Sequence, residues 1–161
     1  VRMALRAKDP ALDFALECAR AVQDAFGAGG DVPRRLRARC RHLIESIYYS
    51  GLAYTLAYAA SKAGGAALNM ALENPKPADI VKRVKEGVRG AEEASYALYG
   101  AFLLASLKQM GVPEVSNAKT VLEVLENLNK SATAVIAEVK ALRFAEWMKR
   151  LAESVFEEER A

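Results

Sequence analysis

The sequence has 161 residues, of which 52% are hydrophobic, and a net charge of +3. This length fits one domain whose core needs no metal or disulfide, and the composition excludes disordered and collagen-like chains. One histidine and two cysteines leave little material for a metal site or a nucleophilic triad, so we expect no metal and no cofactor. Because the net charge is small, any polyanionic partner must bind a local basic patch.

Helical periodicity without any strand pattern or fixed repeat predicts an all-α chain of about six helices. Asp9-Pro10 has the pattern of an N-cap followed by a first-turn proline, and Gly27 follows the first apolar stripe. Asp31-Val32-Pro33 predicts the start of the second helix by the same pattern. We expect this helix to kink or break at Ser50-Gly51.

Glycines and prolines divide the middle of the chain. The next helix has a weak point at Gly64-Gly65, and Asn74-Pro75-Lys76-Pro77 predicts a loop. Helical periodicity resumes from Ile80 to Met110. Within that range, three positions are expected to mark interruptions or close helix contacts: Gly87, Gly90 and Gly100.

Two serines indicate where the last helices begin. Ser116 is expected to cap a short helix, and Ser131 the long final helix, whose apolar positions include Val135 and Val139. The acidic end, 157–159, lies unfavourably on the helix dipole, so we expect it to fray. The chain from residue 1 to 161 is thus predicted to form a single compact, bundle-like domain.

Nothing in the sequence indicates a membrane protein. The longest apolar stretch, Ile47–Ala60, is shorter than the roughly 20 residues that span a bilayer. A signal peptide is not expected, because charged residues interrupt the first segment: Arg2, Arg6, Lys8 and Asp9. We therefore expect a cytoplasmic protein that contacts no membrane.

The two cysteines, Cys18 and Cys40, lie far apart in the sequence and match no metal-binding spacing. One interpretation is a pair of small, buried hydrophobic side chains. The other is a disulfide bridge of the kind found in proteins of hyperthermophiles.

The strongest local feature is a basic run between Arg34 and His42 that contains no acid. In a helix, Leu36 and Cys40 face inward, and five arginines lie on the outer arc: Arg34, Arg35, Arg37, Arg39 and Arg41. Guanidinium groups suit bidentate phosphate contacts, so we expect a nucleic-acid backbone to bind here. The alternative is a solvated face whose charges pair with acids from other helices.

Two weaker basic segments lie further along the chain. The first, which neighbouring glutamates dilute, comprises Lys82, Arg83, Lys85 and Arg89. The second, on the helix that carries Trp147, comprises Lys140, Arg143, Lys149 and Arg150, and glutamates at helical spacing favour an ion-paired surface there. Tyr48, Tyr49, Tyr54 and Tyr58 suggest base stacking, although helical spacing of this kind is more typical of a core or an interface.

One pattern suggests catalysis. Arg37 and His42 fit the Arg-x4-His motif of all-α HEPN ribonucleases, and Arg35 with His42 gives the x6 version. Such an arginine would hold the scissile phosphate while the histidine moves a proton. In a segment this rich in arginine, the match also arises easily by chance. We therefore expect no enzyme, and keep a HEPN-like ribonuclease and a protein-binding helical adaptor as alternatives.

Three stretches carry a resemblance to a known family. Residues Ile47–Lys62 fit the pattern Ile-x3-Gly-Leu-x2-Thr-Leu-Ala-x4-Lys. Residues Asn117–Leu122 fit an "AKTLL" segment, and Leu142–Ala152 contains Trp-Met-Lys-Arg. In order and spacing, these stretches resemble the small α-helical subunit of the Cmr (type III-B) CRISPR effector complex.

The resemblance implies a noncatalytic structural subunit in antiviral defence. Such a subunit stacks with copies of itself into a short filament, contacts other Cmr subunits, and lines the groove for CRISPR RNA and target RNA. It implies no small-molecule substrate and no membrane partner. It supplies no catalytic residue, and Lys149-Arg150 is the basic pair within its closing motif. The run Arg34–Arg41 departs from the family pattern, so its RNA contacts are inferred from the residues alone.

Overall fold

The chain is all-α in a computed structural model that describes residues 8–159, which confirms the predicted fold class. Arg2 and Arg6, two of the four charged residues that argue against a signal peptide, lie in the segment 1–7, outside the described range. Nine helices are found within 8–159, against about six predicted. They are α1 Pro10–Phe26, α2 Asp31–Ser50, α3 Leu52–Ala63, α4 Gly65–Glu73, α5 Pro77–Gly87, α6 Ala91–Gln109, α7 Pro113–Ser116, α8 Val121–Lys130 and α9 Ala134–Val155.

Helix α1 begins and ends where the sequence predicts. The carboxylate of Asp9 accepts hydrogen bonds from the backbone N–H groups of Ala11 and Leu12 at 3.1 and 3.4 Å. Pro10 occupies the first helical position, where its missing N–H costs nothing. Gly27 follows the last helical residue and donates its N–H to the carbonyl of Gln23.

The helix count exceeds the prediction because the weak points at the glycines are full breaks. Gly51 separates α2 from α3 and has φ 94°, and Gly64 separates α3 from α4 with φ 91°. Both values lie in the left-handed region, which glycine enters without a steric penalty. A further break, at residues 88–90, divides α5 from α6 within the predicted 80–110 helix.

Two predicted caps lie elsewhere. Ser116 ends the single-turn helix α7, and the Thr120 side chain caps α8 instead. Thr133 is the residue before α9, and Ser131 lies two positions earlier. The hydroxyls of Ser131 and Thr133 both donate to the buried carboxylate of Glu114, at 2.6 and 2.5 Å, and lower its pKa. This carboxylate therefore joins α7 to the start of α9.

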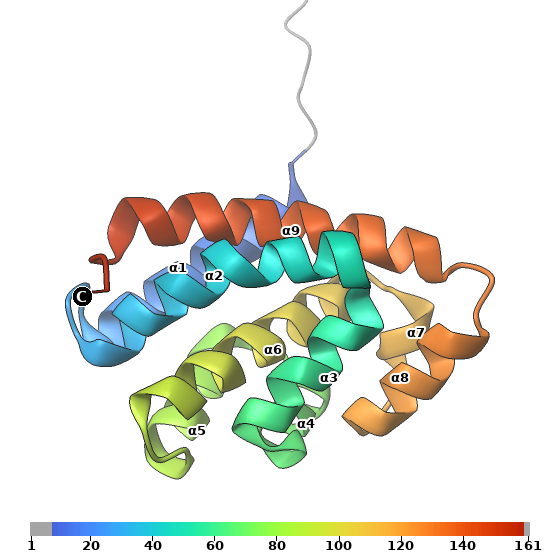
Figure 1. The fold of residues 1–161 in the computed structure, drawn as a ribbon, viewed down its shortest axis with the longest axis horizontal. Helices are drawn as coiled ribbons and strands as arrows, with labels where there is room; N and C mark the ends of the chain where they lie inside the picture. Colours follow the sequence, from blue (N-terminus) through green and yellow to red (C-terminus); the bar gives the residue numbers. More distant parts are fainter. Residues whose placement is uncertain (1–7, 160–161) are drawn as a thin grey trace, which may run out of the picture.

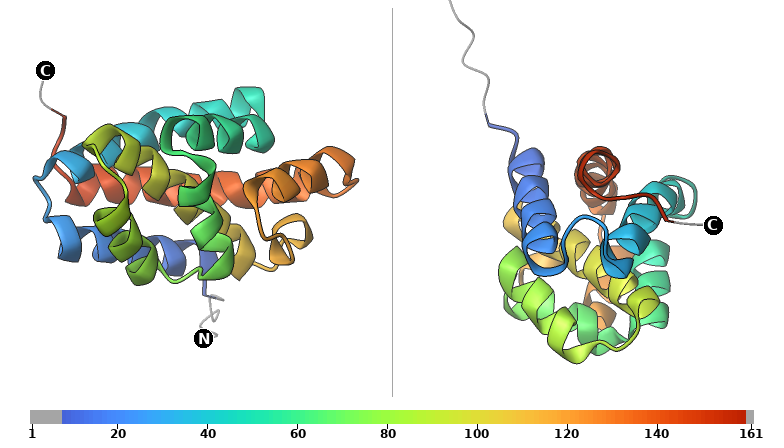
Figure 2. Two further views of the ribbon diagram at one scale, coloured as in Figure 1. Left: turned by 90° about the horizontal axis from the view of Figure 1, so that it is seen from below. Right: turned by 90° about the vertical axis from the view of Figure 1, so that its left-hand side faces the viewer.

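Helix α6 forms the centre of the molecule. Every residue from Ala94 to Leu107 is buried, so the helix is enclosed on all sides rather than amphipathic. Helix α9 lies along the groove between α1 and α2 on one side of α6 (Figures 1 and 2). Helices α3, α4 and α5 cover the opposite side (Figure 1).

Neighbouring helices approach α6 closely at Gly100. A Cβ atom added there would lie 2.6 Å from Leu68 Cδ2 and 3.2 Å from the Cβ of Ala59. Helices α3 and α4 thus pack directly on the α6 backbone, and glycine leaves the space for them. This confirms Gly100 as a point of close helix contact.

The cysteines are free and buried, in agreement with their interpretation as small hydrophobic side chains. Cys18 lies in α1 and Cys40 in α2, and both belong to the core. Burial raises the pKa of both thiols, because an apolar surrounding disfavours the thiolate.

Substitution of Gly100 by alanine should lower the free energy of unfolding by about 1–3 kcal/mol, because the added methyl overpacks the core. Leu68→Ala in the same chain removes the clash, so the double variant should lose less than the sum of the two single losses. Gly87→Ala is the control, since no atom lies within 4 Å of its added Cβ. Denaturant titrations followed by circular dichroism compare these four variants with the unmodified chain, and strict additivity would contradict the tight contact.

Candidate RNA and subunit interfaces

The arginine run lies on α2 as predicted, with Leu36 and Cys40 buried, but it is not an uncompensated strip. Glutamates that follow α9 neutralise its first two guanidinium groups. Arg34 Nη2 lies 2.7 Å from a carboxylate oxygen of Glu157, and Arg35 Nη1 lies 3.7 Å from one of Glu159. The alternative interpretation, in which the run pairs with acids from elsewhere, is therefore correct for this part of it.

The third arginine holds the end of α9. Arg37 Nη1 donates to the backbone carbonyls of Glu153 and Phe156, each at 2.9 Å. Carbonyl groups in the last turn of a helix lack hydrogen-bond donors within the helix. The guanidinium of Arg37 supplies such a donor at the end of α9. The Glu157 N–H also donates to the Ala28 carbonyl at 2.9 Å. The acidic segment thus lies outside the helix, which ends at Val155, in agreement with the predicted fraying, but Glu157 is held by these contacts.

The last two arginines differ from each other. Arg39 Nε donates to Ser95 Oγ at 3.3 Å, and its guanidinium carbon lies 4.4 Å from the centroid of the Tyr96 ring. This arginine therefore joins α2 to α6 through a hydrogen bond and a cation–π contact. Among the five arginines, Arg41 is exposed, whereas the other four are partly buried. Contacts within the chain thus engage four of the five predicted phosphate ligands.

The proposed ribonuclease pair does not form a site. Arg37 and His42 are five residues apart, which places them roughly 140° apart around a helix. Arg37 points towards the end of α9, whereas His42 is exposed. Arg35 shares the face of His42, but seven residues separate them by about 10 Å along the axis. The structure therefore brings neither arginine together with the histidine.

The weaker basic segments lie on opposite sides of α6. Lys82, Arg83 and Arg89 are exposed on or after α5, and Arg83 Nη1 lies 3.5 Å from the carboxylate of Glu73 on α4. On α9, Lys149 is half-buried, and Arg150 pairs with Glu146 one turn away at 3.4 Å. Since α5 and α9 lie on opposite sides of α6 (Figure 1), the basic segments do not converge on one surface.

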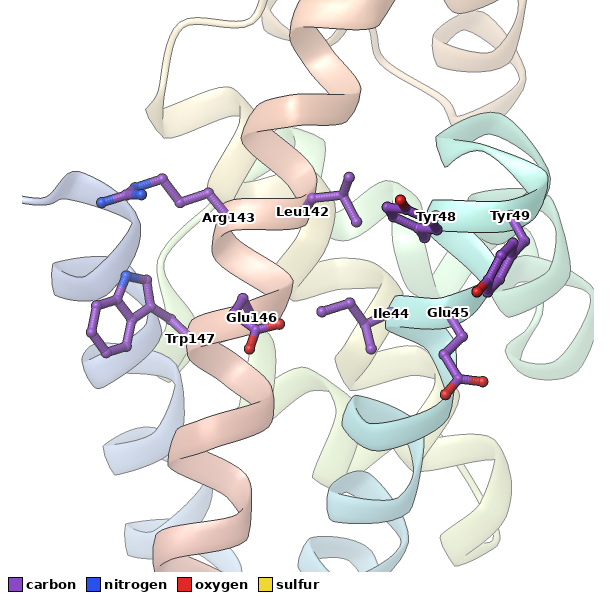
Figure 3. Close-up of a pocket in the computed structure, with 8 residues that line it drawn as sticks. All are labelled: Ile44, Glu45, Tyr48, Tyr49, Leu142, Arg143, Glu146 and Trp147. Carbon is purple, nitrogen blue, oxygen red and sulfur yellow. The ribbon is translucent and has the colours of Figure 1, made fainter.

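A groove that the sequence did not predict opens beside α9. Ile44 and Tyr48 of α2 and Leu142 of α9 point towards one another (Figure 3) and border a cavity of about 600 Å³. Tyr48 is 71% exposed and Tyr49 81%, with their rings edge to face at 5.1 Å between centroids. Such exposure excludes a core role for these tyrosines and leaves the interface and stacking interpretations.

The apolar surface continues from this groove along α9. Val135 and Val139 are 66% and 63% exposed, and their spacing places them on the same face of α9 as Leu142. Contiguous apolar exposure of this kind marks a site of protein contact. We call this surface the apolar face, and it is formed by Ile44, Tyr48, Tyr49, Val135, Val139 and Leu142. Periodicity alone identified Val135 and Val139 as apolar positions but not which side of α9 neighbouring helices cover.

Asp9 fixes the other edge of this groove. Its carboxylate accepts hydrogen bonds from Arg143 Nη2 at 2.6 Å and from Trp147 Nε1 at 3.0 Å. Arg143 and Trp147 lie on the α1 side of α9 (Figure 3), so the cap of α1 also binds α9. The hydrogen bond from Arg143 is the largest cause that lowers the pKa of Asp9, and Trp147 lowers it further.

Within residues 8–159, the structure contains neither a cluster of metal ligands nor a helix that could span a membrane. No group of three or more histidine, cysteine, aspartate or glutamate side chains is arranged to hold a metal ion. No helix in the same range combines the length and apolar character needed to cross a bilayer.

Substitution of Arg37 by alanine should lower the free energy of unfolding by about 1–3 kcal/mol, since two carbonyls lose a charged donor. The loss should be accompanied by faster proteolysis after α9, because the segment at 156–159 loses its anchor. Arg41→Ala is the matched control and should change stability by less than about 0.5 kcal/mol. Equal effects of the two substitutions in urea titrations would contradict the anchoring role of Arg37.

The pKa of Asp9 lies below its usual value of 3.8, which makes its contribution to stability dependent on pH. A lowered pKa means that the stabilisation is present above pH 3.8 and is lost as the pH falls through the folded-state value. Asp9→Asn should therefore destabilise the chain by about 1 kcal/mol at neutral pH and by less in acid. Unfolding titrations between pH 2.5 and 7 measure this, with the exposed Glu126→Gln as control; a constant difference would contradict it.

The chain is similar to known CRISPR-associated proteins along most of its length. Residues 8–155 match the family model of CRISPR-associated protein (Cas_Cmr5). The CRISPR system CMR subunit Cmr5 of Saccharolobus solfataricus is 30% identical over 134 residues, which cover 76% of this chain and 80% of that protein.

Two solved structures share the fold. A chain from the cryo-EM structure of type III-B Cmr-beta bound to cognate target RNA and AMPPnP superposes with a TM-score of 0.65 at 25% identity, over 92% of this chain and 97% of the other. A chain from the Cmr-beta complex bound to non-cognate target RNA gives a TM-score of 0.64 at 23% identity, over 96% and 100%. Since the family match spans nearly the whole chain, this protein belongs to the Cas_Cmr5 family of CRISPR-associated proteins.

Proposed function

We propose that this chain is the small, noncatalytic structural subunit of a type III-B CRISPR (Cmr) ribonucleoprotein. The observation that carries the proposal is the family match over residues 8–155. The similar chain solved in Cmr-beta with target RNA supports it. The proposal includes a cytoplasmic location, a chain that acts as one domain over 1–161, and stacking with copies of itself beside CRISPR and target RNA.

The side-chain arrangement supports a noncatalytic role. The guanidinium of Arg37 binds carbonyls at the end of α9, and His42 lies on another side of α2. A ribonuclease of the Arg-x4-His kind needs both groups on one scissile phosphate. Arg37 instead stabilises the packing of α9 on α2.

The exposed apolar face supports a role in assembly. The face lies on the outer side of α2 and α9, and no described part of the chain covers it. Exposure of two tyrosines and two valines to water is unfavourable, and a second subunit would remove it. We propose that another subunit of the complex, of the same or a different kind, packs on this face.

The basic residues support contact with RNA phosphates, in two groups. The exposed members would contact RNA directly: Arg41, Lys82, Arg83 and Arg89, with Arg150 and the half-buried Lys149 on α9. The engaged members would contact RNA only after their present partners move: Arg34, Arg35, Arg37 and Arg39. Because Arg37 and Arg39 also stabilise the fold, we propose the exposed group as the principal RNA contacts.

The assembly role is tested by Val139→Asp in the native ribonucleoprotein, purified through a tag on a different Cmr subunit. A charge in the centre of the apolar face should reduce the recovery of this chain at least tenfold, because a buried, unpaired carboxylate costs several kcal/mol. Ala78→Asp, on the exposed side of α5, is the matched control and should be recovered normally. Circular dichroism should show equal helicity for both variants.

Two results would contradict the proposed function. Normal recovery of the Val139→Asp chain would exclude the apolar face as the assembly surface. Metal-independent cleavage of single-stranded RNA by the purified chain, lost in His42→Ala, would exclude a noncatalytic role and favour the HEPN-like alternative.

A further inference from the structure

A trough crosses α4 on the side of the molecule away from the apolar face. One cavity, of about 750 Å³, is bordered by α4, α5, the end of α6 and the segment at 116–119. A second, of about 530 Å³, is bordered by the α3–α4 junction, α4, α5 and the start of α6. The two cavities adjoin, since Ala66, Met70 and Arg83 line both, and together they make up the trough. Figure 2 shows α4 between α5 and α8 in the view from below.

Cations line this trough along its whole length. Lys119 and Lys108 border the first cavity, Arg83 borders both, and Arg89 borders the second. They come from the segment before α8, from α6, from α5 and from the residues after α5. The fold therefore brings positive charges that are scattered between residues 83 and 119 together in one trough. Lys108 and Lys119 belong to none of the basic segments visible in the sequence.

Two acids, Glu73 and Glu93, line the trough together with its four cations. Glu73 lies beside Arg83, at 3.5 Å between charged atoms. The carboxylate of Glu93 folds back over Gly90 at the start of α6, where the helix dipole favours a negative charge. Glu73 thus offsets Arg83, and Glu93 lies next to the residue that follows Arg89. Four cations against two acids still leave the trough with an excess of positive charge.

The shape of the trough selects an extended ligand. Its shared floor is the small Ala66 and the flexible Met70, and an added Cβ at Gly64 or Gly65 would meet no atom within 4 Å. No aromatic side chain lines either cavity. Charge without aromatic anchors suits a phosphate backbone rather than bases or an apolar protein segment.

We infer that the trough over α4 holds the phosphodiester backbone of single-stranded RNA, with Arg83 at its centre and Lys119 and Arg89 towards its two ends. Contacts to the backbone alone would make the binding independent of base sequence. The inference rests on the proposed function for the identity of the RNA, but it assigns the contact to residues that the family match does not assign. It also places RNA and the apolar face on opposite sides of α6.

The test uses the purified full-length chain and a fluorescent, unstructured single-stranded RNA, with affinities measured between 50 and 200 mM salt. The variant is Arg83→Gln/Arg89→Gln/Lys119→Gln. Three lost phosphate contacts should reduce the salt dependence by about 2 logarithmic units per tenfold change in salt. The unmodified chain should therefore lose about 20-fold more affinity than the variant over this range.

The matched control is Arg20→Gln/Lys76→Gln/Lys130→Gln, which removes three exposed charges outside the trough. This control should keep the salt dependence of the unmodified chain. An equal reduction in the control would overturn the inference, since net charge alone would then explain the binding. Absence of measurable binding by the unmodified chain at 50 mM salt would overturn it too.

Two further measurements distinguish an RNA backbone from other ligands of the trough. If millimolar inorganic phosphate, at matched ionic strength, removes the difference between the chain and its variant, the trough is a compact anion site and the inference fails. If the variant keeps its RNA affinity but is not recovered with the tagged ribonucleoprotein, the trough binds protein and the inference fails. Normal recovery with reduced RNA affinity supports it. Failure of the unmodified chain to be recovered would instead contradict the proposed function.

Discussion

The enclosure of α6 is the constraint on which the rest of the structure depends. A helix buried around its whole circumference must be apolar on every side and must let its neighbours come close. Alanines and Gly100 provide the second property, since Leu68 and Ala59 lie against the α6 backbone. Two groups of helices then pack on opposite sides of one rod. Their outer surfaces are free for other contacts because the inner surfaces complete the core.

The arginine run shows how one chemical group serves folding where the sequence suggests binding. Guanidinium groups satisfy carbonyl oxygens and carboxylates as well as phosphates, because all three are oxygen acceptors. Arg34 and Arg37 meet such acceptors at the end of α9, more than a hundred residues away in the chain. An RNA that bound there would have to compete with these contacts. The α4 trough presents no comparable competition at Lys119 or Arg89.

Local signals predicted the fold well, and long-range contacts limited the prediction of the site. Asp9-Pro10 and Gly27 define α1 from neighbouring residues alone, and Gly51 and Gly64 break helices as expected. The partners of Arg34 lie beyond the reach of any local pattern. Exposure of Val139 depends on which side of α9 lies over α1 and α2, which periodicity does not encode. Lys119 was missed because a single lysine has no signal until the fold places it beside Arg83.

The position of α6 between the two outer surfaces has a mechanical consequence. Close-packed interiors are nearly incompressible, and this rod touches helices on both sides. A subunit seated on α9 and an RNA strand seated over α4 would be held apart by the thickness of the core. The chain would then act as a rigid spacer, and each added copy would advance protein and RNA together by one fixed step. In such an assembly the packing of alanines around α6 would fix the distance between the protein partner and the RNA in every copy.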